Sequence, residues 1–189
     1  HLVNDMLLFS RSGTVGSDTV AVEDLLHEAR RIFESHPQTD NGRIDIVNAA
    51  PGAMLHGNRE ALLSALQNLV NNAVQAGGEH GRVQLLATYV QEPAGMATVD
   101  LVVSDNGPGV PEEIQEHLFE PFFTTRAQGT GLGLAVVQAI AQAHHGAAWF
   151  ETGPGAGSRF AMRLPLINTR HGAPEGTPAA ENISTRSDA

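Results

Sequence analysis

The sequence predicts an α/β domain, because patterns typical of helices and of strands are interspersed along most of the chain. Apolar residues recur at helical spacing in several segments, and short apolar or alternating runs typical of strands lie between them. Turns that contain glycine separate most of these segments. The expected helices cover residues 21–33, 59–76 and 132–144, and the expected strands cover residues 44–47, 83–90, 97–103, 147–151 and 158–164.

Each expected helix has signals of its own. The face of the first helix consists of Val22, Leu25, Leu26, Ala29 and Phe33. The second helix follows Asn58, a favourable N-cap residue, and stops at Gly77 and Gly78. The third helix opens in a glycine-rich segment and ends at Gly146.

The expected strands are grouped by their turns. Residues 44–47 alternate between apolar and polar side chains. A turn that contains Pro93 and Gly95 joins the next two strands, and a Gly-Pro-Gly turn joins the last two.

The two ends of the chain differ from its middle. Residues 1–11 have the apolar stripe of the last turns of a longer helix, and residues 12–17 are typical of a flexible joint. Residues 168–189 are rich in Gly, Pro, Ser and Thr and nearly lack apolar side chains, so we expect them to be disordered. The chain begins with His1 in the middle of this helical pattern, and we interpret it as a fragment of a longer protein.

Composition excludes some classes of function. The chain of 189 residues has 11 Lys and Arg against 21 Asp and Glu, a formal net charge of −10. Such a charge repels phosphate backbones and anionic lipids, which argues against nucleic acid as the main partner and against direct membrane contact. Without cysteine, no disulfide forms, which suits the cytoplasm. No apolar run approaches the ~18 residues of a membrane span.

A segment without an obvious helix or strand covers residues 105–130. Loops of this length are uncommon inside a compact domain and are usually functional, often as a lid over a ligand. Its ends are rich in glycine, which lets the backbone approach a ligand closely. We therefore expect an active-site lid here.

Two asparagines on the second helix form the first motif. Asn68 and Asn72 are four residues apart, so their amides share one helix face. Two amide oxygens can hold a Mg²⁺ that keeps its waters and phosphate oxygens. The alternative is a pair of solvent-facing helix residues.

An aspartate at the end of a strand forms the second motif. Asp105 precedes Gly107 and Gly109. A carboxylate at this place could accept a hydrogen bond from a base amine, while the glycines would admit the ring. The alternative is an ordinary turn after the strand.

The lid contains the third and fourth motifs. Phe119, Phe122 and Phe123 are unusual in a loop, and anchoring of the loop to the core is the alternative explanation. Residues 129–134 are glycine-rich and open a helix, where backbone N–H groups and the helix dipole favour phosphate.

The order and spacing of the four motifs resemble the histidine kinase branch of the family that includes DNA gyrase, the Hsp90 chaperone and the mismatch-repair ATPase MutL. Residues 68–73 are similar to the N box, 105–109 to the first glycine box, 119–123 to the F box and 129–134 to the second glycine box. The resemblance covers residues 20–166. It implies a two-layer α/β sandwich of the Bergerat type, with a mixed, mostly antiparallel sheet, helices on one face and an ATP lid.

The resemblance also implies the domain organisation. Residues 1–12 would end the dimerisation and phosphoacceptor domain, 13–19 would be a linker, 20–167 the catalytic ATP-binding domain and 168–189 a disordered tail.

The ligands and roles implied by the resemblance are specific. Asn72 would be the principal Mg²⁺ ligand with Asn68 assisting, and both would serve catalysis together with Arg126. Asp105 would accept the adenine amine. The implied nucleotide contacts are Asn68, Asn72, Ala76, Asp105, Gly107, Gly109, Val110, Thr125, Arg126, Gly129, Thr130, Gly131, Leu132, Gly133, Leu134 and Ser158.

The chain departs from the family pattern at two places. Where many relatives have a basic or aromatic residue after the second asparagine, this chain has Val74, Gln75 and Ala76, so we expect Arg126 in the lid to supply the cation. The phosphoacceptor signature is also missing, because Ile32 stands where a proline would follow His27. The adjacent His144 and His145 would point apart on a helix, and we expect them at the surface rather than on a metal.

The leading functional prediction is an enzyme part that binds Mg·ATP and transfers the γ-phosphate to a histidine of its own dimerisation domain in a homodimer. That histidine would then supply a response regulator. Residues 119–126 and 129–134 resemble sensors of nitrogen or flagellar regulation, whose regulators activate sigma-54 promoters. The alternatives are a gyrase-type or chaperone-type ATPase and a nucleotide-gated binding module. The ATPases place a water-orienting carboxylate where this chain has Asn68, which favours transfer over hydrolysis.

Overall fold

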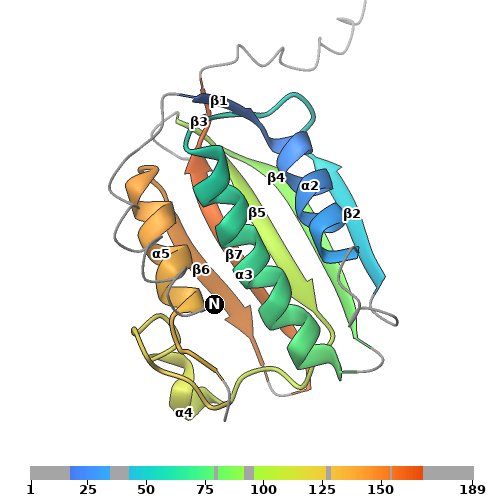
Figure 1. The fold of residues 1–189 in the computed structure, drawn as a ribbon, viewed down its shortest axis with the longest axis vertical. Helices are drawn as coiled ribbons and strands as arrows, with labels where there is room; N and C mark the ends of the chain where they lie inside the picture. The colour runs from blue at the N-terminus through green and yellow to red at the C-terminus, as the bar shows by residue number, and fades with distance from the viewer. Residues whose placement is uncertain are drawn as a thin grey trace, which may run out of the picture.

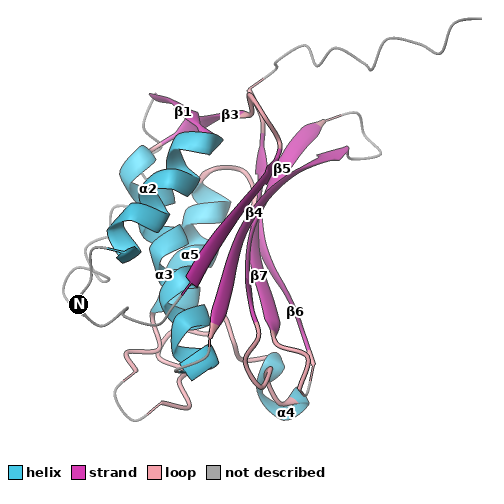
Figure 2. Ribbon diagram, turned by 90° about the vertical axis from the view of Figure 1, so that its right-hand side faces the viewer, coloured by secondary structure: helices cyan, strands magenta, loops and turns pink. Residues whose placement is uncertain are grey.

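The helices of the described chain pack on one face of a five-stranded sheet, as Figures 1 and 2 show. The structure is a computed structural model that describes residues 18–34, 43–78, 81–91, 96–126, 129–153 and 155–167. The helices on the sheet are α2 (Val22–Glu34), α3 (Arg59–Gly77) and α5 (Gly133–Ala143). The predicted two-layer α/β sandwich is confirmed.

The sheet is mixed and mostly antiparallel, as expected. Its order is β2-β4-β5-β7-β6, and within it only β2 and β4 run parallel. The strands are β2 (Arg43–Ala49), β4 (Arg82–Gln91), β5 (Ala97–Asp105), β6 (Ala147–Thr152) and β7 (Ser158–Pro165). Each contains the strand expected from the sequence at that place.

The core lies between the sheet and the helices. Alternate residues of β5, such as Val99 and Leu101, face the helices and are fully buried. Leu62, Leu66 and Leu69 of α3 are buried against them. Burial of each such side chain stabilises the fold by about 1.5–3 kcal/mol. α3 is therefore the central helix, and its position depends on this packing.

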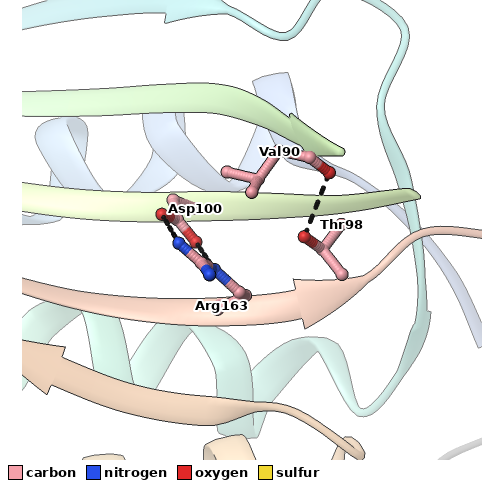
Figure 3. A network of polar contacts seen from close by, with 4 residues as sticks. All are labelled: Val90, Thr98, Asp100 and Arg163. Carbon is pink, nitrogen blue, oxygen red and sulfur yellow. Dashed lines mark hydrogen bonds and ion pairs between the residues drawn. The ribbon is translucent and has the colours of Figure 1, made fainter. Parts of the chain in front are cut away.

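The outer face of the sheet carries polar side chains that are paired with one another. Arg163 of β7 donates two hydrogen bonds to Asp100 of β5, at 2.7 Å and 2.8 Å, in the arrangement drawn in Figure 3. Thr98 donates to the carbonyl of Val90 on β4 at 3.2 Å. The two-point ion pair lets a buried aspartate remain on this face.

A small two-stranded sheet lies at one end of the domain. It pairs β1 (Asp18–Ala21) with β3 (Met54–Gly57) in antiparallel fashion. Leu166 forms a bridge with Leu55, and the Ile167 N–H donates to the Met54 carbonyl at 2.9 Å. Both ends of the described domain therefore meet on β3, and Asp18 and Thr19 of the expected linker belong to a strand. Neither strand was expected, because four residues are too few for a periodic signal.

The expected surface position of His144 is wrong. Its side chain is 5% exposed and lies directly after α5. Its Nε2 accepts a hydrogen bond from the Asn58 N–H at 3.0 Å, so Nδ1 carries the proton and donates to the Ile140 carbonyl at 2.7 Å. A Cβ on Gly57 would lie 2.1 Å from the His144 ring, so only glycine fits there. His145 is exposed, as expected.

The expected helix boundaries are confirmed within two residues. Asn58 caps α3 by accepting the Ala61 N–H at 3.0 Å, and Gly78 follows the helix with φ 60. The predictions for residues 1–17 and 168–189 lie outside the described residues. No helix in the described part of the chain is long and apolar enough to cross a membrane.

Candidate functional site

The four motifs come together at one end of the sheet, opposite the β1–β3 end. The second half of α3, the end of β5, the start of β7 and the start of α5 reach this end, and the segment with the short helix α4 (Glu112–Gln115) lies beside them (Figures 1 and 2). The short helix was not expected. The segment from Asn106 to Leu132 otherwise lacks regular structure among its described residues, as predicted for a lid.

The two asparagines of α3 have different surroundings. The Asn68 Nδ2 is buried and has no hydrogen-bond partner among the described residues. The Asn68 Oδ1 faces the start of α5, 3.7 Å from where a Cβ on Gly133 would lie. Asn72 is half-buried, and its Oδ1 accepts a hydrogen bond from Arg126 at 3.2 Å. An unpaired buried amide beside a glycine-rich helix start leaves a donor available to a polar ligand.

Arg126 joins the lid to α3. In addition to Asn72 Oδ1, its guanidinium donates to the Asn72 carbonyl at 3.3 Å and to Gln75 Oε1. The sequence singled out Arg126 as the cation of the site, and the structure places it against Asn72, the expected metal ligand. Gln75 was noted only as a departure from the family pattern, and its contact with the lid was not predicted.

Asp105 ends β5 and faces several groups that act on its charge. Burial raises the pKa of its carboxyl group above the ordinary value. Backbone hydrogen bonds from Gly107 (2.8 Å) and Ser158 and the charge of Arg126 lower the pKa, but less than burial raises it. The carboxylate is thus held in place by the backbone of its own motif.

The glycines of the first glycine box are required by the protein backbone. A Cβ on Gly107 would lie 2.8 Å from the Ala76 carbonyl oxygen of α3. Gly109 has φ +78, and its Cβ would lie 2.0 Å from the Gly153 carbonyl oxygen. The two glycines therefore let the segment pass between α3 and the β6–β7 turn.

A small hydroxyl network ties this segment to the sheet. The Val110 N–H donates to Thr152 Oγ1 at 2.9 Å, and Thr152 Oγ1 lies 3.0 Å from Ser158 Oγ. Ser158 is 5% exposed. Thr152 was not predicted, because a threonine at the end of a strand gives no signal in the sequence.

The phenylalanines of the lid have separate roles. Phe119 packs against Phe150 of the sheet with ring centroids 6.0 Å apart, so core anchoring, the alternative explanation, holds for this residue. Phe122 is 66% exposed and has φ 68, a strained backbone for a bulky residue. Phe123 packs against His117 at 5.5 Å.

The base of the lid is closed by a backbone contact. The Phe122 N–H donates to the Gly131 carbonyl at 2.8 Å. Gly131 has φ +66, and a Cβ there would lie 2.4 Å from the carbonyl carbon of Phe122. The second glycine box thus joins the C-terminal end of the lid to Phe122 in its interior.

The start of α5 has no side-chain cap at Leu132. Thr130 Oγ1 accepts the Leu132 N–H at 3.3 Å, and Leu132 itself is buried. Helix N-termini of this kind carry backbone donors and the positive end of the dipole. Of the remaining predicted contacts, Gly129 and Thr125 are exposed in the lid, and Leu134 packs against the core.

The chemistry of the oxygen atoms at this end of the sheet limits which metal ion could bind there. No cluster of three or more His, Cys, Asp or Glu that could hold a metal occurs in the ranges that the structure describes. The oxygens at this end of the sheet include the amide oxygens of Asn68 and Asn72 and the carboxylate of Asp105. Neutral amide oxygens that are completed by waters and phosphate oxygens suit a hard cation such as Mg²⁺.

Comparisons with known proteins agree with this arrangement. Residues 57–168 match the family described as histidine kinase-, DNA gyrase B-, and HSP90-like ATPase. The sensory histidine kinase/phosphatase NtrB of Azospirillum brasilense is 31% identical over 94% of the chain and 46% of its own length. The sensor protein kinase FleS of Pseudomonas aeruginosa is 41% identical over 88% of the chain and 40% of its own length. The chain thus spans less than half of these relatives.

Solved structures of histidine kinases share the fold. The catalytic domain of ThkA is 30% identical and superimposes with a TM-score of 0.68, over 78% of this chain and 94% of that one. Full-length ShkA in complex with AMPPNP is 30% identical with a TM-score of 0.73, over 87% of this chain and 35% of that one. ThkA in complex with the response regulator TrrA is 26% identical with a TM-score of 0.71, over 88% of this chain and 46% of that one.

The family match covers more than half of the chain and includes all four motifs. The fold agrees with that of the solved catalytic domain. The chain therefore belongs to the histidine kinase-, DNA gyrase B- and HSP90-like ATPase family.

Proposed function

We propose that this chain is the ATP-binding catalytic part of a protein-histidine kinase, which transfers the γ-phosphate of Mg·ATP to a histidine of a dimerisation domain. The observation that carries the proposal is the convergence of an orphaned amide, a partly buried carboxylate and an uncapped helix start at one end of the sheet. The complex of ShkA with AMPPNP, an analogue of ATP, supports the same ligand class.

The base would be recognised at the β5 end. Asp105 would accept a hydrogen bond from the adenine amine, and Gly107, Gly109, Val110 and Ser158 would border the ring. The carboxylate is held by the Gly107 N–H, so it meets the base already oriented. Guanine presents a carbonyl at that edge and would be rejected.

The phosphates would be bound between α3 and α5. The first turn of α5 supplies backbone donors, and the buried Nδ2 of Asn68 supplies another. Asn72 and Asn68 would hold Mg²⁺, which neutralises phosphate charge when bound. Arg126 would supply the remaining positive charge from the lid.

Transfer is favoured over hydrolysis because no carboxylate accompanies Asn72 on its helix face. The position four residues before it is Asn68, and an amide does not act as a general base for water. A phosphotransferase needs only positioning and charge neutralisation, because the histidine is itself the nucleophile. An ATPase of the gyrase or chaperone type is the second candidate.

The partners follow from the relatives. NtrB and FleS are sensor kinases, and ThkA has been solved with the response regulator TrrA. We infer a dimerisation domain of the same protein, a homodimer, and a response regulator of the sigma-54 type at the cytoplasmic side. The net charge of −10 is unfavourable for nucleic acid.

A reconstitution experiment tests the proposal. This chain is incubated with radiolabelled ATP, with and without a separate dimerisation domain that contains the histidine. The expected result is acid-labile label on the added domain alone, at a slow rate because the tether is missing. Label on the chain itself would show that one of its own histidines, such as His27, is an acceptor, and rapid hydrolysis without an acceptor would favour the ATPase.

A further inference from the structure

One guanidinium bridges the lid and a single turn of α3. Arg126 Nη1 donates to Asn72 Oδ1 at 3.2 Å and to Gln75 Oε1, and its Nη2 donates to the Asn72 carbonyl at 3.3 Å. All three acceptors are neutral oxygens. An arginine held by three hydrogen bonds has a defined place, although its residue is exposed.

The backbone of Arg126 is also held on the lid side. Its N–H donates to Thr124 Oγ1 at 3.1 Å, and its carbonyl accepts the Gly129 N–H at 3.1 Å. The contact between Phe122 and Gly131 closes the base of the same segment. Only the side chain of Arg126 therefore needs to move when its acceptors change.

Two cations would contact Asn72 Oδ1 in the proposed function. The metal would use this oxygen, and Arg126 contacts it in the structure. Two positive charges a few ångströms apart repel each other, and Mg²⁺ demands near-ideal geometry. Arg126 Nη1 must therefore leave Asn72 Oδ1 when the metal binds, whereas the Asn72 carbonyl and Gln75 Oε1 still offer their oxygens. Of these two acceptors, Gln75 is the one that already bonds to Nη1.

We propose that Gln75 is a positioning residue for Arg126. It retains the guanidinium while Asn72 turns to the metal, so that Arg126 stays beside the phosphates and does not swing into solvent. A neutral amide suits this role because it holds the cation without neutralising it. The inference rests on the proposed Mg·ATP site and adds a residue to it.

A double-mutant cycle tests the coupling. Gln75→Leu, Arg126→Ala and the double variant are compared for the initial rate of transfer to the separate dimerisation domain. We expect each single variant to slow transfer about tenfold, and the double variant to be no slower than Arg126→Ala. Gln142→Leu, which changes an exposed glutamine of α5, should leave the rate unchanged. Losses that multiply to about a hundredfold would overturn the proposal.

A charged variant separates positioning from general stability. Gln75→Glu keeps the acceptor but traps Arg126 in an ion pair. We expect slower transfer with the Kd for Mg·AMPPNP within about threefold of the wild type, and transfer at the wild-type rate would contradict the role of Gln75. Failure of the wild-type chain to bind Mg·AMPPNP would refute the proposed function itself. Binding by the wild type with multiplying losses would refute only the role of Gln75.

Discussion

The two ends of helices α3 and α5 are built differently. At the β1–β3 end, Asn58 caps α3 and its own N–H is accepted by the buried His144, which follows α5. Toward the opposite end, the Nδ2 of Asn68 in the middle of α3 is buried without a partner among the described residues, and the start of α5 lacks a side-chain cap. Polar groups near the β1–β3 end of these two helices are thus satisfied within the protein, whereas the amide of Asn68 and the start of α5 offer donors to the region where the four motifs meet.

We therefore expect the β1–β3 end to contribute to the stability of the domain and the region of the four motifs to contribute to nucleotide binding. Polar groups paired inside the protein contribute to folding, whereas an unpaired buried group lowers the free energy of unfolding and favours a ligand that pairs it. Substitutions at the two ends should therefore separate into those that unfold the domain and those that only weaken nucleotide binding or transfer.

The largest expected effect is on transfer, at the ligand end. Asn72→Ala should abolish Mg-dependent phosphotransfer in the reconstituted system, because the proposed metal ligand is removed. The helix tolerates alanine well, so the free energy of unfolding should change by less than about 1 kcal/mol. The neighbouring exposed Asn71→Ala is the matched control. Normal transfer by Asn72→Ala would show that the metal assignment is wrong.

At the paired end we expect a large effect on stability alone. His144→Ala removes the acceptor of the Asn58 N–H and leaves a cavity, which should lower the free energy of unfolding by about 2–4 kcal/mol. Urea titration measures this loss. His145→Asn, at the exposed neighbour with φ 59, should change it by less than about 0.5 kcal/mol. An intact domain whose nucleotide affinity alone is lost would reverse the proposed division between the ends.

An intermediate effect is expected for Asp105→Asn. The new amide can still accept the Gly107 N–H through its oxygen, but it turns donors toward the adenine amine. A charge-assisted hydrogen bond contributes about 1.5–3 kcal/mol, so ATP affinity should fall roughly ten- to a hundredfold. Calorimetry with ATP and GTP measures this. Equal affinity of the unmodified chain for both nucleotides would remove Asp105 from the base site.

The smallest effect is the pH dependence of ATP binding. Burial raises the pKa of Asp105 in the folded chain without nucleotide. Protonation of this carboxyl group therefore stabilises the fold at low pH, and this stabilisation is lost as the pH rises through the raised pKa. Adenine needs the charged form. Affinity should therefore decline on acidification at a higher pH than for an ordinary aspartate.

The same pH dependence is sensitive to the lid. Arg126→Ala removes a charge that lowers the pKa of Asp105, so the decline in ATP affinity should begin at a still higher pH. Titration of ATP binding for both chains measures the shift. A decline at the same pH in both would show that Arg126 does not act on this carboxylate.

Local patterns predicted the long elements and the motifs. Helix α3 has an N-cap, an apolar face and a glycine stop, each readable within a few residues. Strands β1 and β3, with four residues each, have no such period and form through pairing with each other. Burial of His144 could not be predicted, because its partner Asn58 lies 86 residues away.

By itself, the sequence determined the fold class and the residue types at the ligand end, because both depend on short-range periodicity and on the spacing of asparagine, aspartate and glycine. Tertiary structure alone decided which polar groups are satisfied. Arg126 meets Gln75 across 51 residues of chain and His144 meets Asn58 across 86, whereas the Asn68 amide has no partner in the part of the chain that the structure describes. The physical reason is that hydrogen-bond partners are set by packing of distant segments, which no local pattern encodes.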